Sequence, residues 1–146
     1  MEIKVYKLSD SSRIPTYGTE QSAGLDLYSC TDEDVIINPS DIVLISTKLI
    51  IEIPDGYYGA ICSRSGLSLH HGIVVPNSPG IIDSDYRGEL KVILHNISKK
   101  SFTITSGMRI AQMIIMKYSK ATFAECGIND MTETIRGEGG FGSTSY

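Results

Sequence analysis

The chain has 146 residues, of which 41% are hydrophobic and 21% are charged, a composition typical of one globular domain. Its formal net charge of −4 argues against a general nucleic-acid-binding protein, because such proteins normally carry a basic face. No apolar run reaches the roughly 20 residues that span a bilayer, and residues 1–10 lack the apolar core of a signal peptide. We therefore expect neither a nucleic-acid nor a membrane partner.

The three cysteines, Cys30, Cys62 and Cys126, are far apart in the sequence and form no CxxC pair. An odd, scattered set of cysteines is typical of reduced thiols, and its spacing does not match a zinc site. We therefore expect a reducing compartment, the cytoplasm, or the nucleus if the source is eukaryotic or viral.

Short β-branched runs separated by turns make up most of the chain. They predict strands over residues 3–8, 35–37, 42–46, 49–53, 57–62, 73–75, 89–95, 102–105 and 110–118. Turn signals such as Pro54-Asp55-Gly56 and Ser106-Gly107 lie between them. This rhythm predicts an all-β sandwich or barrel, with room for one short helix over residues 66–71.

Residues 50–53 and 113–116 are apolar enough to be buried on both faces, which in so small a chain suggests burial between subunits. From Thr132 onward the composition changes, and residues 136–146 are rich in glycine without any core-forming periodicity. We therefore expect a single β domain over residues 1–135 and a flexible tail over 136–146. The tail carries one arginine, one phenylalanine and a Ser-Thr pair, which suit phosphates and a flat base.

Five stretches carry side chains suited to chemistry. In order they are residues 22–27 (SAGLDL), 63–67 (SRSGL), 77–90 (NSPGIIDSDYRGEL), 107–112 (GMRIAQ) and 136–144 (RGEGGFGST). The third is the longest and the most specific. Within it, Pro79-Gly80 suit positions i+1 and i+2 of a type II turn, and such a hairpin would expose backbone amides and carbonyls.

The residues alone leave several alternatives open. Pro79-Gly80 also fits an ordinary β-turn, and Asp83 and Asp85 also fit a solvated pair of surface carboxylates. The Ser65-Gly66 pair that precedes the predicted helix is either a plain N-cap or a phosphate-binding terminus.

Taken together, the order and spacing of the five stretches resemble the five motifs of the trimeric dUTPases, over roughly residues 4–144. The resemblance implies an all-β, distorted jelly-roll-like β-barrel that assembles as a homotrimer and exchanges its C-terminal tail between subunits. It also implies Mg²⁺-assisted hydrolysis of dUTP to dUMP and pyrophosphate, which limits uracil incorporation into DNA and supplies dUMP for dTMP synthesis.

The resemblance assigns roles to residues of the third stretch. Asp83 matches the catalytic aspartate, which orients and deprotonates the attacking water, and Tyr86 matches the tyrosine that packs under the deoxyribose. The hairpin would read the uracil edge. The residues expected to contact base and sugar are Asn77, Gly80, Ile81, Ile82, Tyr86 and Lys91. A solvated strand lysine remains the alternative for Lys91, while Arg87 and Glu89 are expected to make structural pairs.

The other stretches match the phosphate and metal side of the family's site. Asp26 matches an aspartate that holds Mg²⁺ through water, with the ion bound mainly by substrate phosphates. The residues expected to contact the phosphates are Arg64, Ser65, Gly66, Gln112, Arg136, Gly142, Ser143 and Thr144. Phe141 would stack on the uracil. Ser63 departs from the proline usual in the family, and Met108 from an acidic or polar residue.

Two other functions remain open. A dCTP deaminase resembles the same fold but lacks the RGxGGFGST tail. A catalytically silent nucleotide-binding regulatory protein would also keep the fold. Release of pyrophosphate from dUTP, release of ammonia from dCTP, and binding without turnover distinguish the three.

Overall fold

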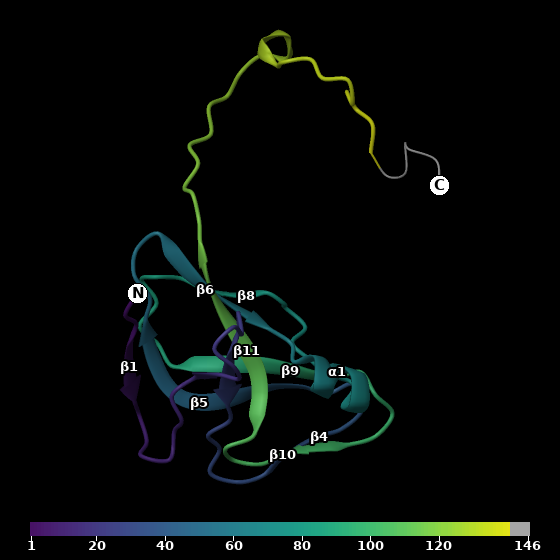
Figure 1. Cartoon of the computed structure of the whole chain (residues 1–146). Helices are drawn as coiled ribbons and strands as arrows, with labels where there is room; N and C mark the ends of the chain where they lie inside the picture. Colours follow the sequence, from purple (N-terminus) through teal and green to yellow (C-terminus); the bar gives the residue numbers. More distant parts are fainter. Residues whose placement is uncertain (141–146) are drawn as a thin grey trace.

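In the computed structural model, which describes residues 1–140, antiparallel β-sheets face one another across an apolar core (Figure 1). In chain order the elements are β1 (Lys4–Lys7), β2 (Thr16–Tyr17), β3 (Leu25–Tyr28), β4 (Val35–Ile37), β5 (Ile42–Glu52), β6 (Tyr57–Cys62), α1 (Ser65–His71), β7 (Ile73–Val74), β8 (Gly80–Ile82), β9 (Leu90–Asn96), β10 (Phe102–Ile104), β11 (Arg109–Lys117) and the 3₁₀ turn η1 (Ile128–Asp130). The predicted all-β, jelly-roll-like class is confirmed.

Two larger sheets and one small sheet make up the body. One sheet has the strand order β1-β5-β9-β7, the second has the order β2-β3-β11-β6-β8, and β10 pairs with β4. Within residues 1–140 the sheets are not joined into a closed barrel. The edge strand β8 pairs only with β6 in this part of the chain, so one side of its backbone remains available.

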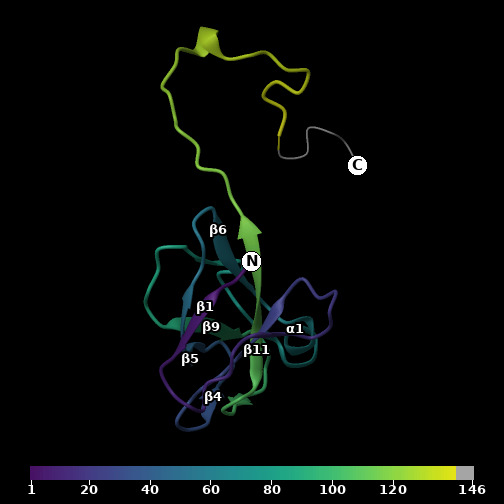
Figure 2. The ribbon, with the colours of Figure 1, turned by 60° about the vertical axis from the view of Figure 1, so that its left-hand side comes forward.

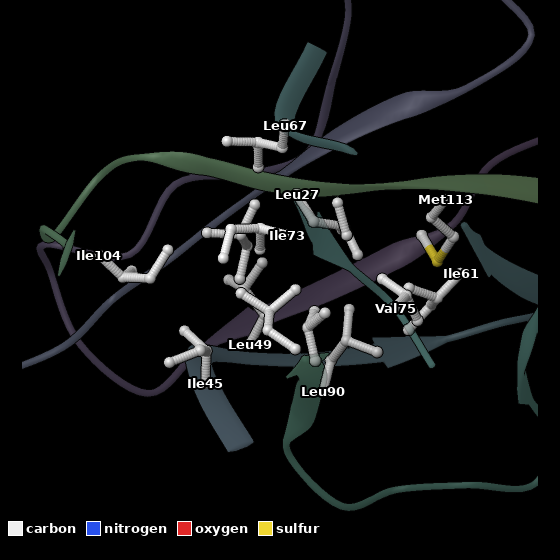
Figure 3. Packing of buried hydrophobic residues seen from close by; sticks show 14 of the residues in the cluster. Leu27, Ile45, Leu49, Ile61, Leu67, Ile73, Val75, Leu90, Ile104 and Met113 are labelled. Carbon is white, nitrogen blue, oxygen red and sulfur yellow. The ribbon is translucent and has the colours of Figure 1, made fainter. Parts of the chain in front are cut away.

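The core lies between the two larger sheets, and the alternation of side chains along each strand supplies it. In β9, Leu90, Val92 and Leu94 are buried, whereas the intervening Lys91 is exposed. Figure 3 shows Leu90 with Leu49 of β5 on one side of the core and Leu27, Ile61 and Met113 of the other sheet. Burial between subunits at residues 50–53 and 113–116 stays a prediction.

Three local predictions were wrong. Strands β2 and β3 were not expected, because neither carries the apolar, β-branched run that marks the predicted strands. Residues 42–46 and 49–52 belong to one continuous strand, β5, which ends one residue before the predicted boundary at 53. The type II turn at Pro79-Gly80 is absent, because Gly80 has no positive φ and pairs with Ile61 as the first residue of β8. The hydrogen-bonded turn lies earlier, from the Val75 carbonyl to the Ser78 amide.

A β-bulge explains why β5 looks like two strands in the sequence. The register between β5 and β9 shifts between Ser46 and Leu49, and Lys48 adopts a left-handed φ of 54°. The Glu89 carboxylate accepts hydrogen bonds from the Ser46 hydroxyl and, at 3.0 Å, from the Lys48 amide. Burial raises the pKa of Glu89, but these bonds and the neighbouring Lys91 outweigh burial and lower the pKa below 4.5. The expectation that Glu89 makes structural pairs therefore agrees with its contacts.

After Lys117 the chain leaves the two sheets as an extended arm, which both views show running away from the body (Figures 1 and 2). The apolar side chains of this arm are exposed, with Phe123 at 96% and Ile135 fully accessible. The domain division at residue 135 stays a prediction. No helix in residues 1–140 is long and apolar enough to cross a membrane.

Candidate active site

A pocket of about 400 Å³ opens where the end of β8 approaches β9, and we call it the β8–β9 pocket. Its apolar floor includes Ile61 and Val75. Seven of the predicted site residues line it: Asn77, Gly80, Ile81, Ile82, Asp83, Tyr86 and Lys91. Sequence motif and geometry thus converge on the same face of the molecule.

Gly80 shapes the wall of this pocket. A Cβ built on Gly80 would lie 3.0 Å from Nδ2 of Asn77, so the absence of a side chain lets the amide approach the strand. The outer edge of β8 can therefore offer backbone groups beside the Asn77 amide. A planar ligand edge with alternating acceptors and donors can pair with such a strand edge.

The loop between β8 and β9 is fixed by its own hydrogen bonds. The Tyr86 amide donates to the Asp83 carbonyl at 3.2 Å, which closes a turn. The Arg87 guanidinium donates to the carbonyls of Ser84 and Tyr86, at 2.6 and 2.9 Å. The Asp83 carboxylate is exposed and has no hydrogen bond or ion pair with residues 1–140, so its lone pairs are free to accept a proton.

A second pocket of about 400 Å³ lies beside the start of α1 and the middle of β11, and we call it the α1–β11 pocket. In it, Asp26 is held between two arginines. Nε of Arg64 lies 2.9 Å from one carboxylate oxygen, and NH1 of Arg109 lies 3.3 Å from the other. Only 15% of the Asp26 side chain is exposed. Two guanidiniums around one carboxylate leave a net positive charge, which suits an anionic ligand.

Further polar groups of this pocket are set by close packing. The Gln112 amide donates to the Ser63 carbonyl at 2.9 Å, and a Cβ on Gly24 would lie 2.6 Å from Oε1 of Gln112. The Ser63 hydroxyl accepts from the Val75 amide at 2.8 Å, which ties this turn to the residue that follows β7.

Helix α1 begins at the predicted phosphate-binding stretch. Ser65 and Gly66 are its first two residues and line the pocket. Its N-cap is Arg64, which makes no side-chain capping bond, so Ser65 is not the N-cap. The amides of the first turn are therefore left to bind other acceptors.

The two pockets lie on opposite faces of the five-stranded sheet. Asp26, Gln112 and Cys62 are paired across β3, β11 and β6, and residues paired in this way point to the same face. Their neighbours Met113 and Ile61 point to the other face, into the core, where Ile61 reaches the β8–β9 pocket. A ligand that reached both pockets of one chain would therefore have to pass around the edge strand β8.

The residues expected in the tail lie apart from both pockets. Arg136 is on the exposed arm, where its Nε donates to the Gly139 carbonyl at 2.8 Å. Phe141, Gly142, Ser143 and Thr144 lie outside the described residues.

Arg109 is a site residue that sequence reasoning missed, although its stretch was singled out. Strict alternation along a strand places Arg109 and Gln112 on opposite faces. A β-bulge between Arg109 and Ala111 breaks the alternation and brings Arg109 onto the face of Gln112 and Asp26. A basic residue close before Gln112 in the same stretch was the available signal.

Comparison with known proteins gives a consistent result. A family model described as dUTPase matches residues 10–145. The chain is 52% identical over 145 residues to the deoxyuridine 5′-triphosphate nucleotidohydrolase of Rickettsia typhi, covering 99% of this chain and 97% of that protein. The corresponding Rickettsia felis protein is 50% identical, with 98% and 96% covered. A dUTPase of Staphylococcus bacteriophage 80alpha, solved with dUPNHPP, superposes with a TM-score of 0.89 at 27% identity, over 99% of each chain.

Proposed function

Because the chain belongs to the dUTPase family, we propose that its two pockets are parts of one active site that hydrolyses dUTP to dUMP and pyrophosphate. The chain is an enzyme that acts on dUTP. The observation that carries the assignment of the site is the β8–β9 pocket, where Asp83, whose carboxylate has no partner among residues 1–140, lies next to Tyr86 and to the edge of β8 that is unpaired in the same residues.

We assign the nucleoside to the β8–β9 pocket. Uracil presents acceptor, donor and acceptor along one edge, which matches the backbone of β8 and the Asn77 amide. Cytosine presents a donor where uracil has O4, and a site built on hydrogen bonds can reject such a mismatch by roughly 10⁴-fold. The ring of Tyr86 would pack against the deoxyribose and leave no room for a 2′-hydroxyl.

We assign the triphosphate to the α1–β11 pocket. Arg64 and Arg109 supply positive charge there, and the uncapped amides of Ser65 and Gly66 supply neutral donors. Asp26 keeps the two guanidiniums in place before substrate arrives, which reduces the entropy lost on binding. Gln112 would contribute its amide to the same phosphates.

The donor set fits a metal ion that is held through substrate and water. Within residues 1–140 no group of three or more Asp, Glu, His or Cys side chains could hold a metal ion by itself. Asp26 is the carboxylate of the α1–β11 pocket, and each of its oxygens keeps a lone pair that can accept from a metal-bound water. When bound to the phosphates, Mg²⁺ would neutralise their developing charge.

The chemistry that we propose is attack by water on the α-phosphorus. Asp83 would orient one water in line with the leaving pyrophosphate and accept its proton. Arg64 and Arg109 would stabilise the charge that develops on the leaving group. No side chain becomes bonded to the substrate in this scheme.

We further propose that the active enzyme is a homotrimer whose sites are shared between chains. The five-stranded sheet lies between the two pockets, which supports an arrangement in which the nucleoside pocket of one chain faces the phosphate pocket of another. The exposed apolar arm that carries Arg136 supports this arrangement, because its side chains need a partner to be buried. The tail, residues 136–146, would close a site on another subunit.

We place this enzyme in the cytoplasm. Its three cysteines are all free thiols, and Cys126 is exposed. Exposed thiols persist in a reducing compartment. Cell fractionation that recovered the protein with an oxidised thiol from an extracytoplasmic fraction would contradict this location.

A substrate panel tests the proposed function. The purified chain with Mg²⁺ should release pyrophosphate from dUTP, and far more slowly from dCTP, dTTP and UTP. Ammonia release from dCTP would indicate a deaminase, and tight binding of dUTP without turnover would indicate a silent binding protein. Either result would overturn the assignment.

A further inference from the structure

Gly88 lies two residues after Tyr86, beside the hydroxyl end of its ring. A Cβ built on Gly88 would lie 2.5 Å from Cζ and 2.9 Å from Cε2 of Tyr86, and would also overlap the phenolic oxygen. The φ of Gly88 is not in the left-handed region, in contrast to Gly56, Gly72, Gly107 and Gly137. The φ at position 88 therefore does not itself call for glycine, and the three nearest atoms that a Cβ would meet all belong to the Tyr86 ring, so a side chain here would force that ring to move.

The ring of Tyr86 is held from its far end as well. Its hydroxyl donates to the Glu89 carbonyl at 3.0 Å. Glu89 is in turn tied by its carboxylate to the bulge of β5, through the Ser46 hydroxyl and the Lys48 amide. The hydroxyl end of the ring thus lies against Gly88 and is anchored by one hydrogen bond, while 44% of the residue remains exposed, partly towards the β8–β9 pocket.

We propose that Gly88 is a positioning residue that sets the plane of the Tyr86 ring and thereby the preference for 2′-deoxyribose over ribose. The inference rests on the proposed contact between Tyr86 and the sugar. Ordinary van der Waals contact begins near 3.4 Å, so an alanine methyl at position 88 must displace the ring by about 1 Å. This displacement moves the ring from its present position and lengthens the hydrogen bond from its hydroxyl to the Glu89 carbonyl. The close fit at C2′ that separates dUTP from UTP is then lost.

A double-mutant cycle in the intact enzyme tests this inference. Gly88→Ala, Tyr86→Ala and the double variant are compared with wild type by kcat/KM for dUTP and for UTP. A misplacement of about 1 Å can cost on the order of 10²-fold. We expect Gly88→Ala to lower the dUTP/UTP ratio by about 10- to 100-fold, chiefly through a higher KM for dUTP, because Asp83 is untouched.

In the Tyr86→Ala background the same Gly88→Ala change should have no further effect, since the ring that it displaces is gone. Ser84→Ala is the matched control. It is a small change in the same loop, and the Ser84 hydroxyl makes no hydrogen bond with residues 1–140. Its dUTP/UTP ratio should stay within about twofold of wild type.

Three results would overturn the inference. One is that Gly88→Ala lowers the dUTP/UTP ratio equally in the wild-type and the Tyr86→Ala backgrounds, which would mean a backbone effect. Another is a crystal structure of Gly88→Ala in which the Tyr86 ring has not moved. The third is an unchanged ratio in Tyr86→Ala, which would remove the sugar contact itself. If Tyr86→Ala lowers the ratio while the cycle shows no coupling, the inference about Gly88 fails and the proposed role of Tyr86 stands.

Discussion

Asp83 is the residue on which the proposed chemistry depends most. Asp83→Asn keeps nearly the same shape at an exposed position, so the variant should fold and bind dUTP as wild type does. It cannot accept a proton, and general-base catalysis is typically worth ~10²–10⁴-fold, so kcat should fall by that order. The measurement is pyrophosphate release, with binding of a non-hydrolysable dUTP analogue as the control. A kcat within threefold of wild type, roughly 0.7 kcal/mol, would assign the base elsewhere.

Arg109, which the sequence motifs did not single out, offers a test of the phosphate binding that we propose for the α1–β11 pocket. Its guanidinium lies 3.3 Å from Asp26 and faces the α1–β11 pocket. Hydrogen bonds to charged groups contribute about 1.5–3 kcal/mol, so Arg109→Ala should raise KM for dUTP roughly 10- to 100-fold. Inhibition by dUMP should weaken much less, because dUMP lacks the outer phosphates.

Arg13→Ala is the matched control for Arg109, because Arg13 stacks 5.6 Å from the centre of the Tyr28 ring and lines neither pocket. Arg13→Ala should leave both KM for dUTP and the inhibition constant for dUMP unchanged. Equal weakening of dUTP and dUMP binding by Arg109→Ala would show that this arginine does not act on the outer phosphates.

At the level of single residues, the sequence motifs predicted the site residues that lie within one stretch of the chain. Asp83, Tyr86 and Asn77 belong to one continuous stretch and share one pocket. The partnership of Asp26 with two arginines was not predicted, because it joins residues from three separate stretches. Such a contact depends on strand register, which no single stretch encodes.

At the level of elements, the bulge of β5 depends on Glu89. Above its ordinary pKa of 4.5 the unfolded and folded chains both carry the charged carboxylate, but only the folded chain binds it with Ser46, Lys48 and Lys91. Because the folded-state pKa is lowered, this stabilisation is present above pH 4.5 and is lost as pH falls through the folded-state value.

Glu89→Gln should therefore destabilise the protein by about 1–2 kcal/mol at pH 7. The gap in Tm between wild type and variant should narrow steadily as the pH falls below 4.5. Thermal unfolding of both proteins at a series of pH values and a fixed protein concentration measures this difference in Tm. Glu52→Gln removes an exposed pair with Lys4 and should change Tm little, so it is the control. A gap that is constant with pH would mean that charge is not the cause.

The elements were predicted where apolar and β-branched residues run together and were missed where the strand is short and polar, as in β2 and β3. The apolar runs of β6, β9 and β11 were recognised, because they form the centres of the two sheets. Strand β3 has only four residues, with Asp26 in its middle, and its pairing with β11 decides its conformation. The division of β5 into two predicted strands came from Thr47 and Lys48, which lie in the bulge.

At the level of the whole molecule, the proposed sharing of active sites between subunits is tested by complementation between two inactive proteins. One carries Asp83→Asn, and the other lacks residues 137–146. The two proteins are unfolded together in equal amounts and refolded, so that about three trimers in four contain both kinds of chain. Each mixed trimer has one complete site out of three. About a quarter of the wild-type activity should therefore return. Neither parent refolded alone should be active.

Mass measurement by native mass spectrometry controls for the formation of mixed trimers. Demonstrated mixed trimers without recovered activity would contradict shared sites, and so would a monomeric wild-type enzyme that hydrolyses dUTP.

The five-stranded sheet between the two pockets has a consequence for how activity would depend on the concentration of the protein. If the sites are shared, a newly synthesised chain is silent until it meets two others. By mass action, specific activity should then fall steeply on dilution below the dissociation constant of the trimer, and rise more than proportionally as expression begins. The fold would thereby give the enzyme a concentration threshold without any regulatory ligand.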